Sequence, residues 1–162
     1  MNVSRIAVDH VQVVTGKPFD KVTKVFEQHL GQFDPEVYKA LTAGVDAEKV
    51  RTKIEAMAGP SGFMLFRTSD HGALLRLAGQ TRKAVQYLLG NPLLAVRMTQ
   101  HDIRAGLYAP LRVLVYEDEG GKTCVEYDRP SSLFGQFGNA SVTEVATMLD
   151  RKFEQLVAEA IR

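Results

Sequence analysis

Tryptophan is absent from this 162-residue sequence, and cysteine occurs only once, as Cys124. A lone cysteine cannot form an intramolecular disulfide, which argues against a small disulfide-stabilised secreted domain. No apolar run approaches the roughly 18 consecutive residues of a membrane span. The first residues also lack the basic segment and unbroken apolar run of a signal peptide. We therefore expect a soluble, cytoplasmic protein with no membrane partner.

Net charge is also nearly absent. The chain has 20 basic and 19 acidic residues, which gives a formal net charge of +1, so no global field is available to hold nucleic-acid phosphates. Hydrophobic residues make up 45% of the chain and charged residues 24%, as in ordinary globular proteins. A chain of 162 residues has the usual size of a single domain and is long enough to bury one hydrophobic core. We expect a single domain over residues 1–162 that does not bind nucleic acid.

Common catalytic and cofactor motifs are missing as well. The sequence contains no G-x-S-x-G elbow, C-x-x-C pair or H-E-x-x-H helix, the signatures of acyl transfer, dithiol redox chemistry and zinc proteolysis. Residues 120–123 resemble the end of a phosphate-binding P-loop, but they separate two predicted strands rather than a strand and a helix. The four histidines lack the local spacing of metal ligands. We expect no metal and no cofactor, and Cys124 is interpreted as a small buried hydrophobe.

Apolar periodicity and capping residues predict the secondary structure. The predicted strands cover residues 6–13, 63–68, 73–78, 83–89, 111–116 and 123–128, with the last two joined as a hairpin. The predicted helices cover 18–30, 34–43, 46–57, 91–104 and 141–160, and Ser141 with Glu144 is interpreted as the capping box of the last one. Residues 129–140 are predicted to form a loop or a short helical turn. We expect an α/β fold of the α+β type, a mainly antiparallel sheet of about five to six strands covered by helices, with a C-terminal amphipathic helix.

Several short motifs occur in a characteristic order. They are Asp70-His71-Gly72, Gly90-Asn91-Pro92, the run from Ala109 to Tyr116, and Tyr127-Asp128-Arg129-Pro130. In these residues the chain resembles the domain of unknown function 302 (DUF302) family of bacterial proteins, and we expect residues 32–60 to be a helical insertion relative to shorter members. The resemblance implies an antiparallel sheet covered by helices, assembly as a homodimer and no established activity.

Arg112 stands out because it lies in the run 111–116, which is otherwise apolar on both faces as in a buried central strand. A buried charge needs a partner. A three-residue hairpin turn would place Arg112 opposite Asp128, and Leu114 opposite Glu126, whereas a two- or four-residue loop would pair Arg112 with Tyr127. An ion pair would make Arg112 structural. Convergence with other polar side chains on open space would instead make it an anchor for an anion.

His71, Asn91 and Tyr116 complete the set of candidate ligand-binding residues. Asn91 begins a helix whose free backbone amides favour an anionic group, although capping alone also explains it. His71 is the one weak candidate for a catalytic residue, as an acid/base. Its neighbour Asp70 is equally well explained by hydrogen bonds to turn amides.

Three functions remain open. The first is binding of a small anionic metabolite, a carboxylate or phosphate, in a pocket near residues 90–116. The second is an enzyme of unrecognised type, with His71 as acid/base and Arg112 as substrate anchor. The third is a homodimeric interaction protein without a small ligand. The aromatic loop at 131–139 is expected to act as a lid, to dock on another subunit, or to pack on its own domain.

Overall fold

The computed structural model describes the whole chain, residues 1–162. Its centre is one six-stranded sheet in the order β1-β6-β5-β4-β3-β2, in which only β2 pairs in parallel. The strands are β1 (His10–Thr15), β2 (Gly31–Gln32), β3 (Met64–Asp70), β4 (Ala84–Gly90), β5 (Leu111–Glu117) and β6 (Thr123–Asp128). The predicted mainly antiparallel sheet is confirmed.

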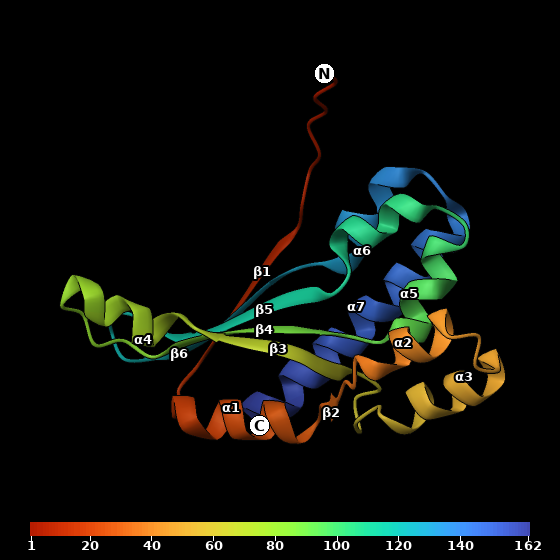
Figure 1. Cartoon of the computed structure of the whole chain (residues 1–162). Helices are drawn as coiled ribbons and strands as arrows, with labels where there is room; N and C mark the ends of the chain where they lie inside the picture. Colours follow the sequence, from red (N-terminus) through yellow and green to blue (C-terminus); the bar gives the residue numbers. More distant parts are fainter.

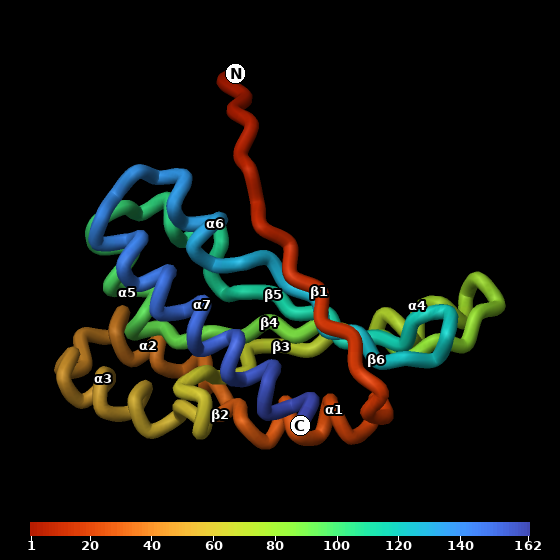
Figure 2. Tube along the Cα trace, turned by 180° about the vertical axis from the view of Figure 1, so that it is seen from behind, coloured from red at the N-terminus to blue at the C-terminus, as the bar shows by residue number.

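Helices lie on one side of this sheet and at its ends (Figures 1 and 2). The α-helices are α1 (Phe19–Gln28), α2 (Glu36–Thr42), α3 (Ala47–Ala56), α4 (His71–Leu75), α5 (Pro92–Thr99), α6 (Pro130–Phe134) and α7 (Ala140–Ile161). Short 3₁₀ helices are η1 (Arg76–Ala78), η2 (Ile103–Tyr108) and η3 (Gly135–Phe137). The segment α4–η1 projects beyond the strands at one end, and residues 1–9 extend away from the sheet (Figure 1).

The main core lies between the sheet and helices α1 and α7. Helix α7 presents one apolar stripe, as its spacing predicts, and its Phe153 packs against Phe63 and Tyr127 with ring centroids 5.1 Å apart in both cases. A smaller cluster of Val37, Val50, Ile54 and Met64 joins α2 and α3 to the start of β3. These two helices fall within residues 32–60, and the status of that region as an insertion stays a prediction.

Several predicted helix starts are confirmed by their hydrogen bonds. Asp46 accepts from the amides of Glu48 and Lys49, and Asn91 accepts from the amide of Leu93 at 2.9 Å. Such bonds satisfy amides that the first helical turn leaves unpaired. The last helix begins earlier than expected, because Asn139 rather than Ser141 caps it.

Three other boundaries differ from the prediction. Residues 73–78 form helix α4 and η1 instead of a strand, because Asp70 accepts a hydrogen bond from the amide of Ala73 and starts a helix. The first strand begins only at His10, since the preceding residues are exposed and Asp9 bonds to Arg129 and Ser132, beyond the end of β6, rather than to a strand. The helix after Asn91 ends at Thr99, because Asp102 caps a separate 3₁₀ helix.

Gly31 and Gly59 bring two chain segments into direct contact. Gly31 was not expected in β2, yet its amide and that of Gly59 both donate to the carbonyl of Phe63, at 2.9 and 3.0 Å. A Cβ added to Gly31 would lie 1.7 Å from the carbonyl oxygen of Met57, and one on Gly59 would lie 2.4 Å from the Gly31 nitrogen. Only glycine fits at both positions.

Candidate binding site on the open face of the sheet

The two faces of the sheet differ in what covers them. Along β5, Val113 and Val115 face the helices and are 1% and 0% exposed, whereas Arg112 points the other way and is exposed. We call this second side the open face. The expectation that β5 is buried on both sides is therefore wrong, because no helix layer covers Arg112. Its charge is solvated and needs no buried partner.

The hairpin register is the one that a three-residue turn predicts. Asp118 and Lys122 close the turn through a backbone bond of 2.9 Å, and Gly121 takes a positive φ of 74°. Leu114 pairs with Glu126, and the same register places Arg112 across from Asp128. Asp128 instead contacts His10, its neighbour on the other side.

A hydrogen-bonded cluster occupies the open face where β1, β6 and β5 lie side by side. His10 contacts Asp128 Oδ1 through Nδ1 at 2.9 Å and Glu126 Oε2 through Nε2 at 3.2 Å. Gln12 donates to Glu126 Oε1 at 2.6 Å and to the Tyr116 hydroxyl at 3.2 Å. That hydroxyl donates to Glu126 Oε1 at 2.5 Å. The cluster fixes the orientation of Tyr116.

These contacts shift three pKa values in the directions that favour the cluster. The hydrogen bond to Glu126 raises the pKa of Tyr116 to about 12, because it stabilises the protonated phenol. The same bond, together with those from Gln12 and His10, lowers the pKa of Glu126. The hydrogen bond to Asp128 is the main cause that raises the pKa of His10. Tyr116 is thus a neutral donor and Glu126 an ionised acceptor at neutral pH.

Tyr116 also borders a hollow beside helix α4. The hollow, which we call the α4 cavity, has a volume of about 400 Å³. Its lining comes from α4, the segment before β4, the open-face positions of β4 and β5, and the last residue of β5: His71, Leu75, Arg82, Lys83, Ala84, Gln86, Leu114, Tyr116 and Glu117. Two of the four predicted ligand-binding residues, His71 and Tyr116, therefore line one cavity.

The other two predicted residues lie elsewhere. Arg112 borders a separate hollow of about 350 Å³ together with Tyr108 and Asp128. Asn91 borders a third, apolar pocket of about 100 Å³. Its side chain is held in place by the fold, because its oxygen caps α5 and one N–H of its Nδ2 donates to the carbonyl of Gly62 at 2.9 Å. The structure does not bring His71, Asn91 and Arg112 together around one ligand.

His71 is exposed at the first position of α4. Asp70 makes the expected structural contact, since its Oδ1 accepts from the amide of Ala73 at 2.8 Å. It therefore serves as a helix cap, a role that does not depend on a hydrogen bond to the His71 ring. No three His, Cys, Asp or Glu side chains are grouped as a metal ion would require.

The aromatic segment 131–139 packs on its own domain. Leu133 and Phe134 are 8% and 0% exposed, and the ring of Phe134 meets Tyr108 edge-on with centroids 6.1 Å apart. The lid and the intersubunit contact are thus not favoured for these buried side chains.

None of the helices has the length and apolarity that crossing a membrane requires.

Sequence reasoning missed Arg82, Lys83 and Gln86 of the α4 cavity and His10 of the cluster. The two-residue period of β4 could have placed Gln86 on the open face, because it shares that face with Leu88. Arg82 and Lys83 were missed because residues 73–78 were expected to form a strand, so no cavity between α4 and the start of β4 was anticipated. His10 reaches Glu126, 116 positions later in the sequence, through the pairing of β1 with β6, and such a distant pairing has no local signature.

Comparisons with known proteins agree on the fold. The profile of a family described as "Domain of unknown function DUF302" matches residues 38–160. The crystal structure of an uncharacterized conserved protein DUF302 from Bacillus stearothermophilus is similar over 94% of this chain and 98% of that one, with a TM-score of 0.66 and 16% sequence identity. A search of curated proteins found no match.

Proposed function

This chain belongs to the DUF302 family, and from the geometry of its own residues we propose that it binds a small anionic molecule in the α4 cavity. The observation that carries the proposal is that His71 and Tyr116 both line one cavity of about 400 Å³. Three of the lining side chains, His71, Arg82 and Lys83, are basic, against one acidic side chain, Glu117. A concave site with a few convergent polar groups is the usual form of a small-ligand pocket.

The chemistry of the cavity suits a carboxylate or phosphate attached to a small apolar body. Leu114 and Ala84 provide apolar surface on the sheet, and the oriented Tyr116 lies beside them. Arg82 and Lys83 pair with exposed carboxylates of Glu119 and Asp20. Surface pairs of this kind contribute little and are screened by salt, so a ligand anion can replace these partners at low cost.

Thermal-shift and calorimetric titrations with carboxylates and phosphate esters test the proposal. A ligand at 100 times its Kd stabilises the protein by about 2.7 kcal/mol, and the binding should weaken with added salt. We expect His71→Gln and Arg82→Gln to weaken binding, while His101→Gln and Arg97→Gln, exposed positions outside the cavity, leave it unchanged. The proposal is contradicted if none of the carboxylates and phosphate esters binds, or if all four variants change binding to the same extent.

Self-association is a second candidate function. Leu74 and Leu77 on the projecting α4–η1 segment are 60% and 90% exposed, and such apolar tips commonly mark contact surfaces. We propose that they dock against a second copy of this chain. Sedimentation should show a dimer for the wild type and a monomer for Leu77→Glu. Leu41→Glu, at a 46% exposed position on α2, is the control and should stay dimeric; a monomeric wild type at high concentration contradicts this candidate.

A further inference from the structure

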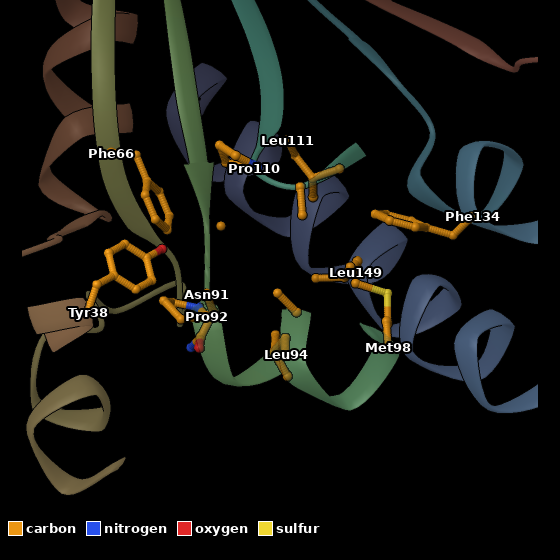
Figure 3. A pocket seen from close by; sticks show the side chains of 13 residues that line it. Tyr38, Phe66, Asn91, Pro92, Leu94, Met98, Pro110, Leu111, Phe134 and Leu149 are labelled. Atoms are coloured by element: carbon orange, nitrogen blue, oxygen red, sulfur yellow. The ribbon is translucent and has the colours of Figure 1, made fainter. Parts of the chain in front are cut away.

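The pocket that contains Asn91 differs from the α4 cavity in its chemistry. It lies where β4 leads into α5 and where β5 begins, and Figure 3 shows Tyr38 and Phe66 on one side of it and Phe134 on the other. Nine of its 13 lining residues are hydrophobic, and none carries a charge. An anion would lose its hydration there without gaining a counter-ion.

The few polar side chains of this apolar pocket are accounted for. Asn91 uses its oxygen to cap α5 and one N–H of its amide nitrogen to bond Gly62, which holds the side chain in place and leaves its second N–H. The Tyr38 side chain lies at the solvent side, since the residue is 55% exposed. The Tyr38 hydroxyl and this second N–H are therefore the polar side-chain groups that remain for recognition.

We propose that this apolar pocket is a second binding site, specific for one small uncharged aromatic ring. Its volume of about 100 Å³ is smaller than the roughly 150 Å³ of an apolar cavity that stays dry and binds benzene, which limits a guest to a single ring. The rings of Phe66 and Phe134 offer edges and faces to an aromatic guest. A phenol fits best, with its ring inside and its hydroxyl toward Tyr38. The inference does not depend on the anion site.

Calorimetry and amide NMR with phenol and benzoate as probes test this site. Phenol should bind and shift the amide signals of Gly90 and Ala95, which line the pocket. Benzoate should bind to this pocket at least about tenfold more weakly, because its charge cannot be solvated there, and its binding here is followed by the shifts of the same two amides, since the α4 cavity is a separate site for carboxylates. Benzoate that shifts the Gly90 and Ala95 amides with an affinity as high as that of phenol, phenol shifts located elsewhere, or no phenol binding up to its solubility would overturn the proposal.

Variants that fill the pocket complete the experiment. Ala95→Leu should weaken phenol binding at least about tenfold by occupying the space, and Ala158→Leu, at an exposed position of α7, should leave it unchanged. If Ala95→Leu does not fold, Gly90→Ala replaces it: a Cβ there lies 3.7 Å from Phe66 and 3.9 Å from Pro110, an ordinary contact distance. Undiminished phenol binding in the filled variant would refute the assignment.

Discussion

The same strands build the covered face and the open face of the sheet, and the two faces differ in burial and in side-chain polarity. On β4, Tyr87 and Leu89 face the helices and are both 0% exposed, whereas the alternating residues Gln86 and Leu88 are only half-buried. The covered face holds the main core together. The open face retains polar groups in fixed positions and the α4 cavity. The two-residue period of a strand thus separates the buried core positions from the more exposed polar positions.

The largest expected effect comes from truncating adjacent leucines of β4. Leu89→Ala should lower the free energy of unfolding by about 2 to 5 kcal/mol, since it leaves a cavity in the core. Leu88→Ala, the same change one residue away, should cost about 1 kcal/mol or less because its surroundings are already hydrated. Urea denaturation measures both. Equal losses would show that something covers the open face in solution.

A smaller effect is expected from removing a tyrosine hydroxyl on each face. Tyr87 is fully buried and donates to Glu27 Oε1 at 2.8 Å, so Tyr87→Phe should cost about 1 kcal/mol. Tyr116→Phe should cost less, because water reaches Glu126 on the open face. It should also raise the pKa of Glu126, which carbon-detected NMR of the labelled carboxylate can follow. An unchanged Glu126 titration would contradict the described hydrogen bond.

The smallest effect concerns pH. His10 has a pKa raised above its ordinary value of 6.5, so the folded state binds the proton more tightly than the unfolded state. Its contribution to stability is complete below 6.5 and disappears as the pH rises through the folded pKa. His10→Gln should therefore lower the Tm at about pH 5.5 and leave it nearly unchanged at about pH 8.5. A larger loss at the higher pH would reverse the assigned sign.

Local patterns predicted much of the fold. The β5–β6 hairpin followed from alternation around a glycine turn, and Asn91 and Asp46 marked real helix starts because capping is decided within a few residues. The error at 73–78 has the same origin. Asp70 is a cap that was interpreted as a turn residue, so helix α4 was missed.

The site was less predictable because it depends on contacts distant in sequence. Arg112 was expected to be buried from the apolar character of its strand, and sequence alone did not tell which face the helices would leave uncovered. His71 and Tyr116 were both named in advance, yet only the position of α4 at the end of the sheet, beside β4, brings them to one cavity. Asn91 and Arg112 border separate pockets for the same geometric reason.

The close approach of Gly31 and Gly59 has a consequence for how this sequence can diverge. Neither glycine is fully buried, so burial alone would class both as tolerant positions. Because the backbones leave no room for a side chain, a saturation library should find them as intolerant as core leucines. Neither substitution can rescue the other, since each added carbon collides with main chain rather than with its counterpart's side chain.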